Sequence, residues 1–455
     1  MILVNEVGMA DPSGDQLPRV APPSPEARRA QGKALRERLN RADMGFWIPE
    51  SGRPDPIETL KAAVAHRDPA LLPIRWGRMA QSPFYFYRGN AALMAADIAP
   101  GPTTGLHSQL CGDAHIINFG AFGKPDGGLA FDLNDFDETC RGPWEWDLKR
   151  LLASAVLGGR EAGHSETSCL EACARCVRAY VVGMDHLADL GIVALSREEI
   201  GPHNDRGALA PIFEKALRST PEKLMEKAID EGPRFKSKGP FLRPLTDEES
   251  IPFLASLAEY HATLGPARQQ MLDDFVPACL GRRVAGCGSL GVMDVLVLCF
   301  GNGPRDPLFL EFKAQHNSVW TPYSSYSSMG HLGRWVAVGQ HRMQTWADPF
   351  LGWSTVAGAP FVVKQWSDHK ASIEVADLVG AVLGDYLELC GTVLAKAHAR
   401  SGDPAMITGY LGEGGELPEA LSSFAVRYAD QATRDWEILK TAIAGGRLNS
   451  WRPGR

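Results

Sequence analysis

The chain has 455 residues, of which 44% are hydrophobic and 22% are charged, and its formal net charge is −7 at pH 7. This is the composition of a globular protein with two domains or one large two-lobed domain. The mild negative charge argues against a general polyanion-binding surface, so we expect no nucleic-acid partner.

The N-terminal part of the chain predicts an arm followed by helices. Residues 1–25 are rich in Pro, Asp and Ser and are expected to form a flexible arm. They lack a basic start followed by an apolar core, so we expect no signal peptide. Helical periodicity then covers residues 26–40, 56–66 and 84–98.

The next part alternates between short strands and helices. Leu106–Leu110 and Leu129–Leu133 are predicted strands, and Cys111–Gly120 between them is a polar loop. Helical patterns follow over residues 144–160, 165–190, 208–230 and 247–274.

A β-rich segment comes next. Its predicted strand cores are residues 284–285, 292–300 and 308–312, followed by a helix over 329–346 and two strands over 350–356 and 360–366. The last predicted helices cover 375–399 and 416–444. The most apolar stretch is interrupted by Asp385 and Glu388, so we expect no membrane span.

Two polar clusters stand out among the apolar strands. Asp113, His115 and Asn118 lie within six residues of each other on the predicted loop. An acidic cluster follows in Phe131-Asp-Leu-Asn-Asp-Phe-Asp-Glu138. A carboxylate base, an amide oxygen and a metal-binding carboxylate are the groups that a phosphoryl transferase uses with Mg²⁺. Taken singly, such acids more often cap turns and helices.

The string Gly112-Asp-Ala-His-Ile-Ile-Asn118 resembles the catalytic loop of aminoglycoside- and choline-kinase-like enzymes, and Asn134-Asp-Phe-Asp137 resembles their metal-binding segment. Cys111 departs from that pattern, because those enzymes usually have His there. The resemblance implies ATP and Mg²⁺ as cofactors and a structural role for Asp147. It further implies Asp113 and His115 as catalytic residues, and Asn118, Asp135 and Asp137 as metal ligands.

A third cluster, Gly286-Cys-Gly-Ser-Leu-Gly291, fits the pattern G-x-G-x-x-G. A Rossmann fingerprint requires a helix after the glycines, but the run Val292–Phe300 predicts a strand. Strand, glycines and strand is the arrangement of kinases, in which the loop covers the phosphates. A hairpin with glycine turns explains the pattern if it is taken alone. The candidate nucleotide-binding residues are therefore Gly286, Gly288, Ser289 and Gly291.

Lys313 ends a third apolar strand. A lysine at the end of a buried strand needs a partner, so we expect Lys313 to contact nucleotide phosphate and to assist catalysis. Kinases pair this lysine with a glutamate on the next helix, but residues 314–347 contain no Glu. Gln340, Gln344 or Glu311 could replace that glutamate.

Longer strings, among them Arg78–Ile98 and Asp348–Trp353, resemble one bacterial family, the domain of unknown function 2252. The resemblance covers about residues 30–445 and brings no established activity. Arg78 and Arg88 lie in the first of these strings and are candidate acceptor-site or structural residues.

The order of the motifs differs from that of ordinary kinases, in which the glycine loop and the lysine precede the catalytic loop. The helix ending in Leu394-Ala-Lys-Ala-His398 resembles the one that normally leads into that loop, and joining the end of the chain to its beginning would restore the usual order. We therefore predict an α+β, two-lobed protein-kinase-like fold that is circularly permuted. Its expected parts are a flexible arm (1–25), a mainly helical large lobe (26–275), a small β-rich nucleotide-binding lobe (276–370) and C-terminal helices completing the large lobe (371–455).

Three cysteines raise the alternative of an iron–sulfur enzyme. The spacing of Cys169, Cys173 and Cys176 matches that of the cysteines that bind an iron–sulfur cluster in radical enzymes that use S-adenosylmethionine, but it also puts them on one face of a helix, which indicates a buried helix face. Nine cysteines without a disulfide framework indicate reduced thiols and a cytoplasmic protein.

We thus expect transfer of the ATP γ-phosphoryl group to a small-molecule hydroxyl acceptor. Two alternatives stay open. One is a pseudokinase-like protein that binds a nucleotide or a partner without turnover, and the other is a nucleotidyltransferase on the same fold.

Overall fold

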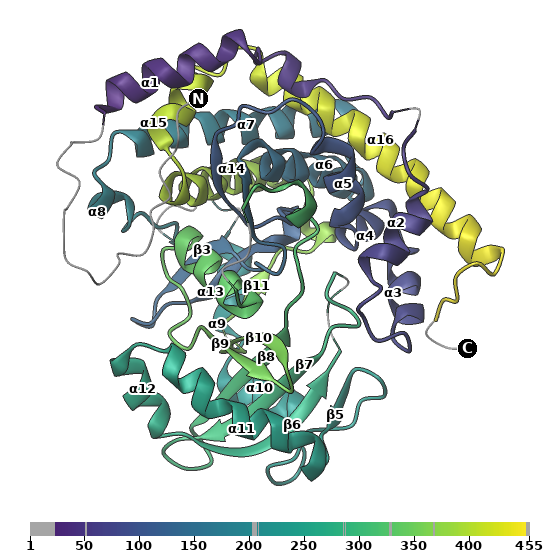
Figure 1. The fold of residues 1–455 in the computed structure, drawn as a ribbon, viewed down its shortest axis with the longest axis vertical. Coiled ribbons are helices and arrows are strands. Elements are labelled where there is room, and N and C mark those ends of the chain that lie inside the picture. The colour runs from purple at the N-terminus through teal and green to yellow at the C-terminus, as the bar shows by residue number, and fades with distance from the viewer. Residues whose placement is uncertain are drawn as a thin grey trace.

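A helical layer and a six-stranded antiparallel sheet lie at opposite ends of the molecule (Figure 1). The computed structural model describes residues 23–50, 52–202, 207, 209–284, 286, 288–326, 330–366 and 369–451. The expected arm, residues 1–25, lies outside these ranges except for its last three residues, and the first helix begins at Pro25.

The six-stranded sheet has the strand order β5-β6-β7-β8-β10-β9. Side chains alternate between its faces, so Val295 and Val297 of β7 join one core cluster while Leu296 joins another. The same alternation puts Glu311 and Lys313 on one face of β8. The strands are β5 (Leu242–Pro244), β6 (Val276–Arg283), β7 (Asp294–Phe300), β8 (Pro307–Ala314), β9 (Gly352–Val356) and β10 (Ala359–Gln365).

Helices cover both faces of this sheet. Phe253 of α11 packs with Phe312 on one face, and Leu224 of α10 joins the apolar cluster on the other. Residues 242–275 pair with or pack on the sheet, whereas the sequence predicted them in the helical lobe. The helices at this end are α10 (Pro221–Ala228), α11 (Asp247–Thr263) and α12 (Pro266–Asp273).

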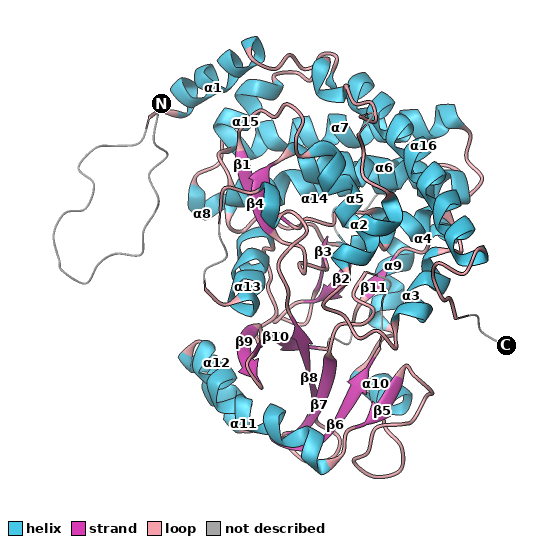
Figure 2. Cartoon of the chain, turned by 45° about the vertical axis from the view of Figure 1, so that its right-hand side comes forward, coloured by secondary structure: helices cyan, strands magenta, loops and turns pink. Residues whose placement is uncertain are grey.

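The helical layer is built around α7 and α14, which pack along each other beside α6 and α16 (Figure 2). Gly391 of α14 lies directly against the backbone of Cys176 in α7, where any side chain would collide. No helix in the described ranges is long and apolar enough to cross a membrane. The remaining helices are α1 (Pro25–Ala34), α2 (Pro56–Ala63), α3 (Leu72–Met79), α4 (Pro83–Arg88), α5 (Ala91–Ile98), α6 (Glu145–Glu161), α7 (Glu166–Ala188), α8 (Ile192–Leu195), α9 (Ala210–Leu217), α13 (Leu332–Met343), α14 (Val382–Ser401), α15 (Pro404–Leu411) and α16 (Leu417–Ala444).

Two small sheets lie between the helical layer and the large sheet. Strand β1 pairs with β4, and β2 lies between β3 and β11. Helix α13 also lies in this region, because it contacts β9 and β10 on one side and β1 and α14 on the other. These strands are β1 (His107–Leu110), β2 (Phe119–Gly123), β3 (Leu129–Leu133), β4 (Cys140–Pro143) and β11 (Ala371–Ser372).

The end of α14 meets the start of β1, although the two are far apart in sequence. The Gln109 N–H donates to Ser401 Oγ at 3.1 Å, and Ser108 Oγ donates to the His398 carbonyl at 3.3 Å. The ends of the described chain, by contrast, lie apart: α1 packs on α15, whereas the Trp451 N–H donates a hydrogen bond to the Pro73 carbonyl in α3 (Figure 1). The close approach therefore occurs at the α14–β1 junction and not at the ends of the described chain.

The predicted helices that differ from the structure break at turn-forming residues. Residues 84–98 form α4 and α5 because Asn90 caps a new helix after Gly89. The helices predicted at 208–230 and 247–274 are each split before a proline, Pro221 and Pro266, because proline starts a helix well and continues one poorly.

Some strands and short helices differ from the prediction as well. Strand β6 ends at Arg283, so the prediction of Val284 as strand core was wrong, and Ala285 lies outside the described residues. The short elements α3, α8, α15, β2, β4, β5 and β11 were not predicted.

Lys396 of α14 and Asp132 of β3 form a buried ion pair that joins the helical layer to the small sheet. Their side chains are 4% and 3% exposed. Lys396→Met leaves Asp132 charged and buried without its partner, so we expect a loss of about 3 kcal/mol in unfolding free energy by urea titration. Adding Asp132→Asn should restore part of it, whereas Lys440→Met at an exposed pair should change stability by less than about 1 kcal/mol. Equal stability of the Lys396 and Lys440 variants would contradict this assignment.

Candidate functional site

The polar loop between β1 and β2 is anchored by Asp147, near the start of α6. Its carboxylate oxygens accept hydrogen bonds from the backbone N–H groups of Cys111 at 2.8 Å and Gly112 at 3.0 Å. His398 of α14 lies 3.5 Å from the same carboxylate and hydrogen-bonds to the Tyr180 hydroxyl at 2.9 Å. An imidazole from another element thus stands beside the loop that has Cys111 where a histidine was expected.

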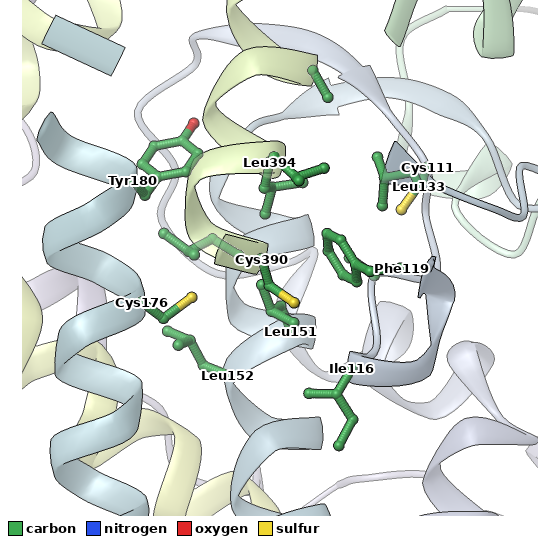
Figure 3. Packing of buried hydrophobic residues seen from close by; sticks show 14 of the residues in the cluster. Cys111, Ile116, Phe119, Leu133, Leu151, Leu152, Cys176, Tyr180, Cys390 and Leu394 are labelled. Atoms are coloured by element: carbon green, nitrogen blue, oxygen red, sulfur yellow. The ribbon is translucent and has the colours of Figure 1, made fainter. Parts of the chain in front are cut away.

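Apolar residues of the same loop fix it in the core. Figure 3 shows Cys111, Ile116 and Phe119 among buried side chains of α6, α7 and α14. All three are completely buried, and the Tyr386 hydroxyl donates to the Ile116 carbonyl at 2.7 Å. The polar residues between these anchors therefore project from a rigid base.

Asp113 faces a cavity from this loop. Its Oδ1 accepts a hydrogen bond from Nε of Arg150 at 2.6 Å, and the Arg150 side chain is fully buried. Its Oδ2 lies beneath the glycine loop, since a Cβ on Gly288 would be 4.0 Å away. His115 Nε2 is 3.8 Å from Oδ2, which is too far for a hydrogen bond. Burial lowers the pKa of His115 to about 4, so its imidazole is neutral at pH 7.

Asn118 ties the loop to the acidic cluster. Its Nδ2 donates to the backbone carbonyls of Asp113 and Asp135, both at 3.1 Å. Because both partners are acceptors, Oδ1 is left to accept or to coordinate. The neighbouring Asp135 side chain is 49% exposed. An amide oxygen and an accessible carboxylate suit a hard cation such as Mg²⁺. No three His, Cys, Asp or Glu side chains of the described residues group closely enough to hold a metal by themselves.

Lys313 reaches from the sheet to the acidic cluster. Its Nζ lies 3.7 Å from Asp135 Oδ2 and in direct contact with Asp137 Oδ2. Burial would lower the pKa of Lys313, but the two carboxylates outweigh it and hold the pKa above its ordinary value. Burial would raise the pKa of Asp135, but the charges of Lys313, Lys364 and Lys370 hold it well below its ordinary range. Both groups are therefore charged at neutral pH.

The residues expected to replace the missing glutamate have other partners. Glu311 pairs with Arg283, and Gln340 donates to Gln344 at 2.9 Å. The partners of Lys313 come from the acidic cluster, which is far away in sequence.

The glycine loop after β6 is held by three arginines from the region of α3. Arg67 and Arg75 donate to the Gly288 carbonyl, the latter at 2.6 Å, and Arg78 donates to the Gly286 carbonyl. The backbone φ of Gly286 is 74°, a conformation that favours glycine. The sequence analysis missed Arg67 and Arg75, because hydrogen bonds to distant carbonyls leave no local pattern.

These segments surround a cavity of about 410 Å³, here called the large cavity. Its volume is within the range of small-molecule sites. The aromatic side chains of Phe122, Trp346 and Trp366 form part of its wall. The predicted site residues that line it are Asp113, His115, Asn118, Asp135, Gly286, Gly288, Ser289 and Lys313.

A second cavity of about 80 Å³, the small cavity, adjoins the large one. The two share Arg88, Asp113, Asp135, Gly288 and Ser289 in their linings. Asp137 lines the small cavity. Gly291 lines neither cavity. Its carbonyl accepts a hydrogen bond from the Asp68 N–H at 3.0 Å. Cys287 of the glycine motif lies outside the described residues.

The three cysteines of α7 lie on its buried face. Cys173 Sγ donates to the Leu152 carbonyl of α6 at 3.6 Å. Burial raises the pKa of Cys169, Cys173 and Cys176, so each is a protonated thiol at neutral pH. Their arrangement is that of a packed helix face, as their helical spacing predicted.

Glu138 was not among the predicted site residues, although it lines the small cavity. Its carboxylate accepts a hydrogen bond from the Val319 N–H at 2.8 Å. Burial, with the negative charge of Asp113 nearby, raises the pKa of Glu138 to about 7.

Glu138→Gln tests this shift. The raised pKa means that the folded chain binds the Glu138 proton more tightly than the unfolded chain. The stability from this group is thus fully present below about pH 4.5 and lost as pH rises through 7. Glutamine does not titrate. Between pH 5 and pH 8 the free energy of unfolding of the variant, measured in urea, should therefore rise relative to that of the wild type by up to about 3 kcal/mol. Glu231→Gln, at an exposed position, should show no such trend. A pH-independent difference for Glu138→Gln would contradict the shift.

Comparison with known proteins identifies the chain at the level of the family. No curated protein and no solved structure matches it. The profile of one family, described as an uncharacterized protein conserved in bacteria (DUF2252), matches residues 67–442. This match covers most of the chain and contains the residues that line the large cavity. The chain therefore belongs to the bacterial family DUF2252.

Proposed function

We propose that this protein is an ATP- and Mg²⁺-dependent phosphotransferase that acts on a small-molecule hydroxyl acceptor. The observation that carries the proposal is the contact of Lys313, from the sheet, with Asp135 and Asp137, from the acidic cluster. Asp113 and the glycine loop lie at the same cavity, so the groups that phosphoryl transfer requires are close together.

The topology supports a kinase-like fold in permuted order. Strands β6 and β7 flank the glycine loop, β8 carries Lys313, and helix α13 follows, which is the order of parts in a kinase small lobe. Helix α14 ends against β1, directly before the loop that carries Asp113. In an unpermuted chain the same contact would be a peptide connection between this helix and the loop.

The large cavity suits ATP on chemical grounds. Its aromatic wall, including Trp346 and Trp366, offers a surface for a base, and Lys313 and the glycine loop offer contacts for phosphates. Asn118 and Asp135 would hold Mg²⁺, whose charge would offset that of the β- and γ-phosphates.

Asp113 would orient the acceptor and take its proton. The acceptor oxygen forms a bond to the γ-phosphorus while the bond from that phosphorus to the bridging oxygen breaks, and ADP leaves with the electron pair. The hydroxyl proton passes to Asp113 Oδ2, because Oδ1 is engaged by Arg150.

The ion pair between Asp113 and Arg150 favours the main alternative, a nucleotide-binding protein without turnover. The ion pair engages one of the two carboxylate oxygens of Asp113, which leaves only Oδ2 for an acceptor hydroxyl. A nucleotidyltransferase on the same fold would use the same cavity and release pyrophosphate, so the identity of the product separates it from a kinase.

Substitutions of Asp135 and Asp113 separate these cases. Asp135→Ala should abolish both the thermal stabilisation by Mg-ATP and the ADP release in the presence of a panel of small alcohols. Asp113→Asn should keep the stabilisation by Mg-ATP and lower turnover by about 100-fold or more, because it removes only the base. Asparagine retains an oxygen for Arg150, and a melting curve checks that the variant folds.

The matched control is Asp126→Asn in the exposed turn between β2 and β3, which should behave as the wild type. Wild-type turnover in both the Asp113 and the Asp135 variants would rule out the assigned roles. Stabilisation by Mg-ATP without turnover in the wild type would favour the alternative.

A further inference from the structure

The small cavity opens onto the same carboxylate as the large one. It is formed partly by helices α2 and α5 and partly by the segment after β8. Figure 1 shows α2 to α5 at one side of the helical layer. Because both cavities contain Asp113 in their linings, a molecule in the small cavity would meet a nucleotide in the large one at that residue.

The acids of the small cavity already have partners. Asp113 is paired with Arg150, and Asp135 and Asp137 share Lys313. Glu138 accepts a hydrogen bond from the Val319 N–H at 2.8 Å. The negative charge of the lining is therefore largely compensated from within the protein.

The arginines of the lining differ from one another. Arg67 and Arg75 each donate to the Gly288 carbonyl of the glycine loop. The Arg88 side chain makes no hydrogen bond and no ion pair with any residue that the structure describes. Its guanidinium is half-buried at the boundary of the two cavities.

The local structure explains why Arg88 points there. It is the last residue of α4, and the chain turns at once because Asn90 caps α5 by accepting the Leu93 N–H at 3.2 Å. The Gly89 carbonyl is held by Arg75. A guanidinium kept in a partly desolvated cavity without a hydrogen-bonded partner is unfavourable, and its fork of donors matches a carboxylate or a phosphate.

We propose that the small cavity is the acceptor site and that the acceptor is a small alcohol carrying a carboxylate or a phosphate group, which Arg88 binds. This rests on the proposed phosphotransferase function. Arg88 holds the anionic group, and the hydroxyl of the same molecule reaches Asp113. A volume of about 80 Å³ limits the acceptor to a few carbon atoms. Of the two arginines in the family-like string, Arg78 is occupied at the glycine loop, so Arg88 is the acceptor-site residue.

The test measures binding without turnover. Glycerate, glycerol 3-phosphate and neutral glycerol are titrated against wild type, Arg88→Gln, Arg88→Lys and Arg305→Gln, and melting temperature reports binding. Arg305→Gln is the control. Arg305 is exposed in the β7–β8 turn, so this variant loses one positive charge, as Arg88→Gln does, but at a position away from the cavities. Mg-ATP is titrated separately.

One or both anions should stabilise the wild type and the Arg305 variant, with about tenfold or more weaker binding in Arg88→Gln and an intermediate loss in Arg88→Lys. Which anion binds tells a carboxylate acceptor from a phosphate acceptor. Mg-ATP should stabilise all four proteins alike.

Three results would overturn the proposal: no binding of either anion to the wild type, equal binding of the anions to Arg88→Gln, or equal binding of neutral glycerol and the anions. Loss of Mg-ATP binding in Arg88→Gln with unchanged anion binding would also overturn it, because Arg88 would then belong to the nucleotide site. If Mg-ATP stabilises none of the four proteins, the wild type included, while anion binding still depends on Arg88, the phosphotransferase function fails and the anion site stands.

Discussion

The contact between Lys313 and the Asp135–Asp137 pair is the interaction on which the arrangement of the site depends. It joins a strand of the large sheet to an acidic turn at the base of the helical layer, and the two carboxylates make the burial of the Lys313 ammonium group tolerable. Without it, an ammonium group would end a buried strand, and the two neighbouring carboxylates would lie close together without a positive charge between them. The sheet and its glycine loop would then lose this direct link to the acids, whereas Asp113 would stay tied to them through Asn118.

The helical side of the site is held more rigidly than the sheet side. Asp147 binds two backbone N–H groups of the polar loop, and Ile116 and Phe119 insert into the core of α6 and α14. The glycine loop, by contrast, is held through hydrogen bonds from arginines near α3 to its carbonyls. A rigid polar loop facing a glycine loop held by hydrogen bonds would suit the proposed reaction, in which a nucleotide must enter and leave.

The distribution of charge divides the site into two halves. In the large cavity, lysines stand near the carboxylates, while the Arg88 side chain, at the boundary of the two cavities, has no partner in the described chain. This asymmetry is the physical basis for assigning a nucleotide to the large cavity and an anionic acceptor to the small one. Both assignments depend on the same point of contact at Asp113.

The sequence alone was enough to pick out the candidate site residues. Polar Asp113, Asn118 and Asp135 between apolar strands, and glycines before a β-branched run, were visible as local patterns, and β3 was predicted at its observed bounds. Only the tertiary structure decided the partners: Arg150 beside Asp113, and the acidic cluster instead of Glu311 beside Lys313. Such contacts join residues far apart in the chain, and the energy of a buried charge depends on what surrounds it in space, which no local periodicity encodes.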